Sequence, residues 1–144
     1  MKSLLALAFI VTIVAFSGNA VAEEKAYVPK QNEELFGTWV NLDYPPGERH
    51  QKIVVHPDGR YERFSQQWFK EPTSKFSYKI TDKWTDSEGN IWYKVRESGL
   101  NYEQYKLHRI SNSGKTMEFV RDGTNYPTEI DQDKYPYRVY NRQE

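Results

Sequence analysis

The residues best suited to metal or acid–base chemistry are few and scattered along this chain of 144 residues. Its three histidines are His50, His56 and His108, and none has a second ligand at the spacing that a metal site requires. The absence of cysteine removes thiol nucleophiles, disulfides and Cys-based zinc sites. We therefore expect no metal and no cofactor, and we interpret the histidines as solvated or hairpin residues.

Acidic clusters provide no stronger evidence for a cation site. Residues 86–90 (Asp-Ser-Glu-Gly-Asn) resemble a calcium loop in composition. Placing Gly89 at the Gly position of an EF-hand loop, however, puts Trp84 where the first carboxylate must stand. We interpret this segment as a solvated turn. A solvated acidic loop is the corresponding interpretation of Glu129, Asp131 and Asp133.

Catalytic motifs are also missing from the sequence. It contains no nucleophile elbow and no serine in a recognisable setting with a histidine and an acid. A pair of catalytic carboxylates that meet in the folded protein is an alternative that the sequence does not test, because sequence does not show which side chains converge. We predict no catalytic residue and a protein that is not an enzyme.

Aromatic residues form 15% of the chain and are the feature that most favours binding. Large rings alternating with charged residues suit strands with one wet face. If Trp39 points into the interior, Asn41 and Asp43 follow it on the same face. The candidate ligand-binding residues are Asn41, Asp43, Arg63, Tyr78 and Tyr93.

Eight short strand-like runs, separated by turn sequences such as Pro57-Asp58-Gly59, must position these residues. No convincing helical stripe interrupts them. Turns at intervals of about 8–12 residues are typical of a sandwich or a barrel, and short hairpin links favour the up-and-down barrel. The expected strands are 38–43, 51–56, 60–68, 76–84, 91–96, 102–110, 115–121 and 135–142.

The period-two pattern predicts which side chains share a face. Met117 and Phe119 should point inward, and Tyr105 and Leu107 should lie on the same face of their strand. The run 76–84 has the clearest alternation, with Asp82 as an exception on its apolar face. The predicted apolar residues of this run are Phe76, Tyr78, Ile80 and Trp84.

The first 22 residues have the features of a secretory signal peptide: Lys2, an apolar run and small residues before cleavage after Ala22, or alternatively Ala20. The apolar run of about thirteen residues is too short to span a bilayer, so we expect no stable membrane insertion after cleavage. Residues 23–34 should form an exposed leader and 35–142 the barrel domain. We expect a periplasmic or secreted protein.

Twenty basic residues balance twenty acidic ones, which argues against a nucleic-acid partner.

The opening Leu35-Phe36-Gly37-Thr38-Trp39-Val40, preceded by a short helical turn at 32–35, resembles the Gly-x-Trp start of the lipocalin and wider calycin families. Residues 105–119, from Tyr105-Lys106-Leu107 to Glu118-Phe119, resemble small bacterial exported lipocalin-like proteins. The resemblance implies an eight-stranded antiparallel up-and-down barrel. The departures are the short length, the lack of a disulfide and the lack of a Thr-Asp-Tyr motif in the corresponding loop.

The resemblance also implies that Trp39 packs at the closed end of the barrel beneath an arginine of the last strand. Arg138 and Arg142 are the two possible partners. We prefer Arg138, because Tyr137 and Val139 flank it in the better-patterned part of the strand. The haem-binding nitrobindin barrels share the Gly-x-Trp opening, but this chain lacks their further glycines and a His-x-Glu-x-Gly sequence.

Two functions follow as expectations. The first is an exported, non-enzymatic binding module that holds a small apolar or aromatic ligand in the barrel mouth, oriented by Asn41, Asp43 or Arg63. The alternative is an envelope or secreted interaction domain with a filled barrel, which contacts another protein through its outer aromatic residues. The proposed outer aromatic residues are Trp68, Trp92 and Tyr140.

Overall fold

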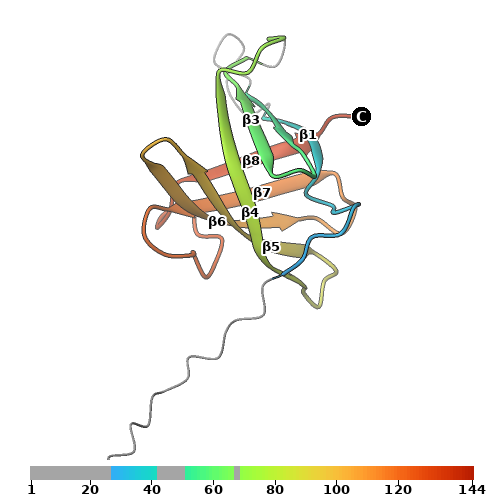
Figure 1. The fold of residues 1–144 in the computed structure, drawn as a ribbon. Helices are drawn as coiled ribbons and strands as arrows, with labels where there is room; N and C mark the ends of the chain where they lie inside the picture. Colours follow the sequence, from blue (N-terminus) through green and yellow to red (C-terminus); the bar gives the residue numbers. More distant parts are fainter. Residues whose placement is uncertain (1–26, 42–50, 67–68) are drawn as a thin grey trace, which may run out of the picture.

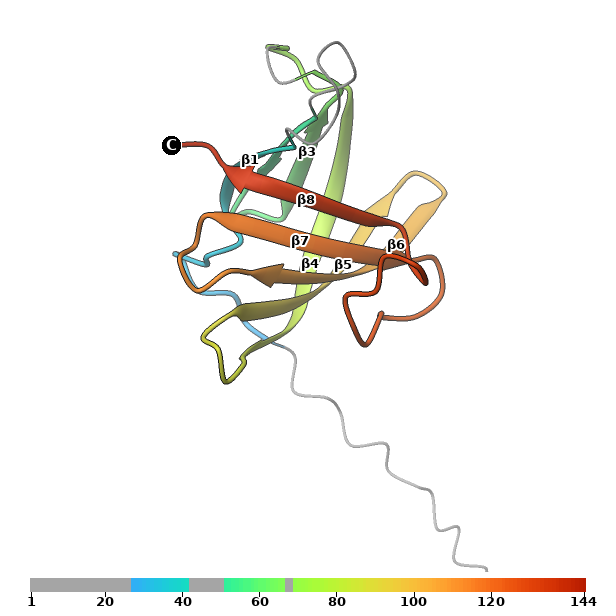
Figure 2. The same cartoon turned by 180° about the vertical axis from the view of Figure 1, so that it is seen from behind.

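A computed structural model describes residues 27–41, 51–66 and 69–144. These residues form eight antiparallel strands that close into one barrel, shown from opposite sides in Figures 1 and 2. The predicted all-β, up-and-down barrel is therefore confirmed. The strands are β1 (Gly37–Val40), β2 (Lys52–Val55), β3 (Arg60–Phe64), β4 (Ser74–Thr85), β5 (Ile91–Gly99), β6 (Tyr102–Ile110), β7 (Thr116–Asp122) and β8 (Tyr137–Arg142).

The barrel closes where the last strand returns to the first. Trp39 of β1 pairs with Arg142 of β8, and Val40 pairs with Asn141. This pairing removes the two free edges that an open sheet would expose. The odd-numbered strands β1, β3, β5 and β7 all terminate at one end of the barrel, which we call the mouth. We call the opposite end the closed end.

Gly37 is required at the start of β1 for two reasons. Its φ of +121° lies in the region that glycine adopts without strain, and a Cβ atom there would come within 3.1 Å of Nη1 of Arg142. The glycine of the Gly-x-Trp opening therefore makes room for the arginine that covers Trp39.

The core lies inside the barrel, with Trp39 fully buried at the closed end. The indole N–H of Trp39 donates a hydrogen bond to the carbonyl of Leu35 at 3.0 Å, and Leu35 itself is buried. The predicted inward orientation of Met117 and Phe119 is confirmed. The core cluster consists of Leu35, Trp39, Ile53, Val55, Tyr61, Tyr78, Ile80, Tyr93, Val95, Ile110, Met117, Phe119 and Tyr140.

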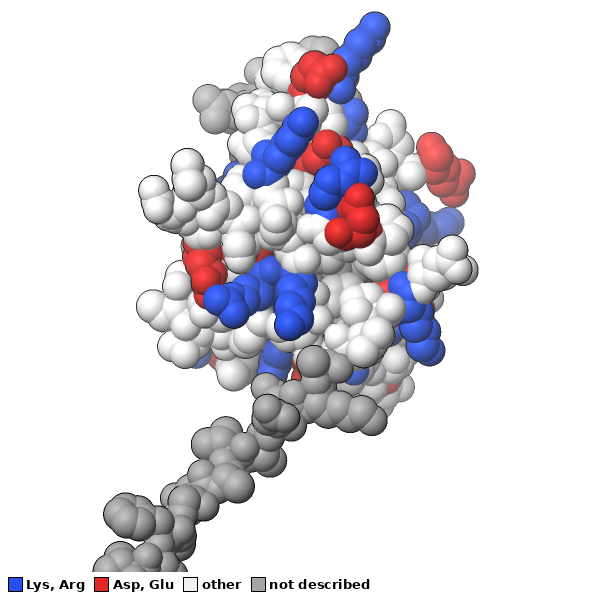
Figure 3. All heavy atoms as spheres, viewed as in Figure 1, with Lys and Arg blue, Asp and Glu red and all other residues white. Residues whose placement is uncertain are grey.

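The segment before β1 seals the closed end. Residues 28–32 are exposed, as expected of a leader, but Glu33 is buried with only 4% of its surface exposed. A single turn, closed by a hydrogen bond from the Phe36 N–H to the Glu33 carbonyl, stands where the helical turn was predicted. The described residues include no helix long and apolar enough to cross a membrane. Basic and acidic side chains are interspersed on the face of the molecule that Figure 3 shows.

The alternation in β4 reverses at a β-bulge just before Asp82. Beyond the bulge, Lys83 lies opposite Tyr93 on the inner face, and Trp84 stacks on Trp92 outside with ring centroids 5.8 Å apart. The prediction that Trp84 shares a face with Tyr78 and Ile80 is therefore wrong; 38% of the Trp84 surface is exposed. The extra residue of a bulge exchanges the two faces, which also explains why Asp82 did not fit the pattern.

Tyr105 and Leu107 share a face as predicted, and this is the outer face of β6. Tyr126, from the connection between β7 and β8, packs edge-on against Tyr105 with ring centroids 5.0 Å apart. The inward side chains of β6 alternate with these residues and include His108, which is 1% exposed. The interpretation of His108 as a solvated or hairpin residue is therefore wrong.

The inner face of β8 carries Arg138, Tyr140 and Arg142 in alternation. Tyr140 is buried and stacks on Phe119 with ring centroids 5.7 Å apart. The prediction that Tyr140 is an outer aromatic residue is wrong. Trp68, the first of that predicted group, lies outside the described residues.

Candidate functional site

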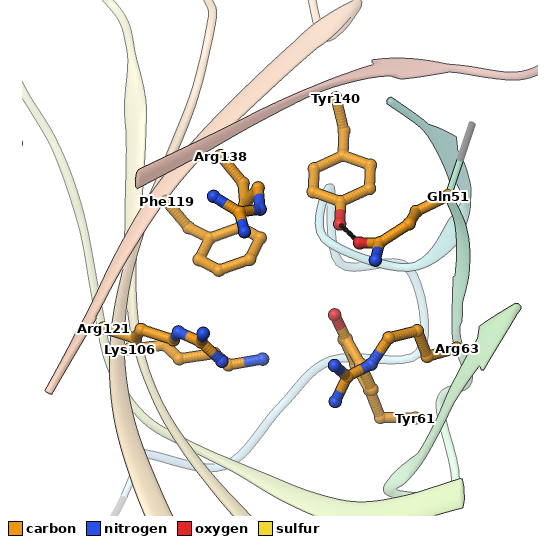
Figure 4. Close-up of a pocket in the computed structure, with 8 residues that line it drawn as sticks. All are labelled: Gln51, Tyr61, Arg63, Lys106, Phe119, Arg121, Arg138 and Tyr140. Carbon is orange, nitrogen blue, oxygen red and sulfur yellow. Dashed lines mark hydrogen bonds between the residues drawn. The ribbon is translucent and has the colours of Figure 1, made fainter. Parts of the chain in front are cut away.

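A small cavity of about 50 Å³ lies inside the barrel at the mouth. Figure 4 shows polar ends of its side chains directed toward a common space. The lining residues are Gln51, Tyr61, Arg63, Lys106, Phe119, Arg121, Arg138 and Tyr140.

Three strands supply six of the eight lining residues by the same local pattern, an aromatic residue and an arginine two positions apart. Because side chains two positions apart lie on the same face of a strand, both point inward. In each strand the arginine is nearer the mouth and the ring is deeper. The pairs are Arg63 with Tyr61 on β3, Arg121 with Phe119 on β7, and Arg138 with Tyr140 on β8.

None of the three arginines has a carboxylate partner among the described residues. Arg63 lies over the ring of Phe76, with its guanidinium carbon 4.9 Å from the centroid. Arg121 donates to Oε1 of Gln104 at 3.2 Å. Arg138 donates to the carbonyl of Tyr137 at 2.7 Å. Each guanidinium has five N–H donors, so donor capacity remains at the mouth.

Lys106 is the fourth cation of the cavity and the only one that has an acidic partner in the described chain. Its amine donates to Oε2 of Glu97, and Oε1 of the same carboxylate accepts a hydrogen bond from the Tyr102 hydroxyl at 3.1 Å. Lys106 is 3% exposed and Glu97 is fully buried. Burial lowers the pKa of Lys106, although the attraction of Glu97 opposes the shift.

Two tyrosine rings extend the polar lining. The Tyr140 hydroxyl donates to Oε1 of Gln51 at 3.2 Å, drawn as the dashed line in Figure 4. Burial raises the pKa of Tyr61 well above its ordinary value, so its hydroxyl remains protonated at neutral pH and available as a donor. With four cations and one carboxylate, the cavity has an excess of positive charge and of hydrogen-bond donors. Such a set of groups suits an anion.

Of the predicted ligand-binding residues that the structure describes, only Arg63 lines this cavity. The Tyr78 hydroxyl donates to the backbone carbonyl of His56, in the turn at the closed end. Asn41 is buried but does not line the cavity. Asp43 lies outside the described residues.

Tyr93 belongs to a second polar cluster, at the closed end. Its hydroxyl donates to Oε2 of Glu34 at 2.6 Å, and Lys83 donates to Glu33 and Glu34 at 2.7 and 2.6 Å. Burial by itself raises the pKa of Glu33, but hydrogen bonds from Lys83, Tyr27 and neighbouring groups lower it to about 2. This cluster ties the segment before β1 to β4 and β5.

Arg142 is the arginine that covers Trp39, with its guanidinium carbon 4.2 Å from the ring centroid. It also donates to the carbonyls of Gly114 at 2.8 Å and Phe36 at 2.9 Å. The preference for Arg138 is therefore wrong. Four residues along a strand span roughly 13 Å, so the register of β8 against β1 allows only one of the two arginines to reach the ring.

The sequence did not predict that Gln51, Lys106, Glu97, Arg121 and Arg138 belong to the site at the mouth. On three strands an aromatic residue and an arginine stand two positions apart, and this repeated spacing could have indicated the site. It becomes informative only when the three strands are known to present the same face to one end of a barrel.

The described residues contain no group of three or more histidine, aspartate or glutamate side chains placed to hold a metal ion. Comparison with known proteins found no family model, no curated protein and no solved structure that matches the chain.

Proposed function

We propose that this protein is an exported, non-enzymatic binding module that takes the anionic group of a small molecule into the barrel mouth. The observation that carries the proposal is the convergence of three arginines without carboxylate partners, in the described chain, on one cavity with Lys106. Like charges held close together destabilise the protein, and a bound anion relieves their repulsion. The lipocalin-like resemblance and the predicted signal peptide are part of this proposal.

The size of the cavity limits the ligand. Pockets for drug-sized molecules have volumes of roughly 300–1,000 Å³, whereas this cavity measures about 50 Å³. At roughly 10–15 Å³ for each water molecule, it accommodates about four waters, or a carboxylate, phosphate or sulfate group. These dimensions favour a compact anion over the apolar or aromatic ligand expected from the sequence, and the remainder of a larger ligand would lie outside the mouth.

The lining also favours a planar or tetrahedral oxyanion over a halide. Guanidinium groups bind two oxygen atoms of a carboxylate or phosphate at once, and the tyrosine hydroxyls add single donors. The aromatic floor and the barrel wall hold these donors away from bulk water, where charge-assisted hydrogen bonds are stronger.

The proposal is tested by NMR titration of the ¹⁵N-labelled protein with acetate, phosphate or sulfate, each exchanged against chloride at constant ionic strength. We expect saturable shifts at the mouth. Arg138→Ala should weaken binding about tenfold or more, since hydrogen bonds to charged groups contribute roughly 1.5–3 kcal/mol. Arg96→Ala is the matched control, because Arg96 pairs with Glu103 on the outer face. Equal affinity of the wild type and Arg138→Ala would exclude the proposed site.

A second candidate function, contact with another protein, is supported by an aromatic surface on the outside of the barrel. Trp84 is exposed and stacks on Trp92, and the guanidinium carbon of Arg109 lies 5.3 Å from the Trp92 centroid. Aromatic residues and arginine are enriched at the centres of protein interfaces. Loss of a partner on substitution of Trp84, with anion binding unchanged, would favour this function.

A further inference from the structure

Lys106 differs from the arginines of the mouth in the chemistry available to it. A guanidinium remains protonated in proteins, whereas the amine of a buried lysine can lose its proton and act as a nucleophile. The Lys106 amine lies 4.5 Å from the centroid of Tyr61 and 5.0 Å from that of Phe119. Figure 4 shows its side chain extending toward the middle of the cavity.

We propose that Lys106 reversibly captures small α-oxo carboxylates, such as glyoxylate and pyruvate, as an imine in the barrel mouth. This inference rests on the proposed anion-binding function and names the ligand class. It assigns covalent capture to Lys106 and electrostatic binding of the carboxylate to the arginines.

An α-oxo acid fits the arrangement because its carbonyl carbon is bonded directly to its carboxylate. A carboxylate held by Arg63, Arg121 or Arg138 therefore places the carbonyl beside the other groups of the same small cavity, where the Lys106 amine lies. Molecules with about five or six non-hydrogen atoms match a cavity that accommodates about four waters. Longer oxo acids would have to extend out of the mouth.

The hydrogen bond between Lys106 and Glu97 provides a route for the proton in this reaction. Glu97 accepts a proton from the Lys106 ammonium, and the free amine attacks the carbonyl carbon to give a carbinolamine. Glu97 then returns the proton to the hydroxyl group, which leaves as water while the C=N bond forms. The ammonium and the carbonyl are converted into a protonated imine and one water molecule, with no oxidant or reductant.

The product preserves the electrostatics of the buried pair. A protonated imine carries the same single positive charge as the ammonium, so Glu97 keeps a cationic partner. Burial lowers the pKa of Lys106, and the positive charges of Arg63 and Arg121 act in the same direction. Both effects increase the neutral amine fraction that attacks the carbonyl, by about tenfold for each unit of pKa.

The proposal is tested by incubating the full-length protein with pyruvate and sodium cyanoborohydride, which reduces an imine to a stable secondary amine. Each modified site should increase the intact mass by the mass of pyruvic acid less one oxygen atom. Peptide mapping should locate this adduct mainly at Lys106. The internal control is Lys115, an exposed lysine in the hairpin between β6 and β7. Labelling of Lys115 with Lys106 unmodified would overturn the proposal.

Lactate distinguishes imine capture from simple anion binding, because it retains the carboxylate of pyruvate but has a hydroxyl group in place of the α-oxo group. Binding of lactate without a pyruvate adduct at Lys106 would refute imine capture and leave the anion site intact. Failure of both ligands to bind would refute both proposals. Lys106→Arg keeps the positive charge beside Glu97 and should lose the adduct; peptide mapping of the wild-type protein decides the question if this variant does not fold.

Discussion

Arginines on the inner face of the barrel have different roles according to their depth. Arg142 is enclosed by the backbone carbonyls of Gly114 and Phe36 and by the Trp39 ring, so it completes the closed end. Arg138, on the same face of the same strand, lies at the mouth and has only the Tyr137 carbonyl as a hydrogen-bond acceptor in the described structure. The residue type is identical, and the environment decides whether it stabilises the fold or remains available to a ligand.

At the residue scale, Arg142→Ala should lower the free energy of unfolding by about 2 kcal/mol. The substitution removes the contact with Trp39 and leaves the carbonyls of Gly114, Phe36 and Glu34 without this donor. Arg138→Ala should change stability by less than about 0.5 kcal/mol. Urea unfolding measures both values. In a Trp39→Ala background the loss caused by Arg142→Ala should shrink, and equal losses for Arg138→Ala and Arg142→Ala would contradict the assignment.

At the scale of single elements, the β-bulge in β4 has the largest consequence. By exchanging the two faces of the strand, it turns Lys83 toward the closed end and Trp84 toward the surface. Lys83 then reaches the buried carboxylate of Glu33 in the segment before β1. A single irregular position in one strand therefore connects the barrel to the segment that seals it.

We expect Lys83→Met to lower the free energy of unfolding by about 3 kcal/mol, because it leaves the buried Glu33 carboxylate without its cation. Lys79→Met is the matched control, since Lys79 lies on the same strand and is exposed. Urea unfolding of the two variants provides the comparison. If Lys83→Met were as stable as Lys79→Met, the ion pair would not be what holds the closed end together.

At the scale of the whole molecule, the closed barrel buries ionisable groups that the unfolded chain exposes to water. His108 is the clearest case, with Nδ1 3.3 Å from the sulfur of Met117 and the ring packed near Phe119. Burial, and secondarily the charge of Lys106, lowers the pKa of His108 well below its ordinary value of 6.5. The native barrel therefore holds this ring neutral.

This burial predicts a loss of stability in mild acid. As the pH falls below about 6.5, the unfolded chain binds a proton at His108 that the native barrel does not bind, so the free energy of unfolding decreases by up to about 1.4 kcal/mol per pH unit. Urea unfolding between about pH 7 and pH 5 measures the slope. Glu33, whose pKa is lowered to about 2, contributes to acid unfolding only below this window.

His108→Gln should reduce the slope in this pH range, because it removes the buried imidazole. An unchanged slope in His108→Gln would show that another group is responsible for the acid sensitivity.

The sequence by itself determined the fold class and the inward position of Trp39. Residues such as Pro57 and Gly59 mark a turn by their own backbone preferences, and alternation along a strand depends only on neighbouring residues. These signals are local, so they can be read without knowing which strands meet. The eight strands and their order followed from them.

Only the tertiary structure decided which arginine covers Trp39, where β4 changes face and which residues meet at the mouth. The register of Arg142 against Trp39 joins residues at the two ends of the barrel domain, and the inner face of β6, with Lys106, is set by its pairing with β5. Strand pairing, bulges and closure depend on contacts between segments distant in sequence. The local pattern of one strand does not contain this information, because it defines two faces without specifying which one lies inside the barrel.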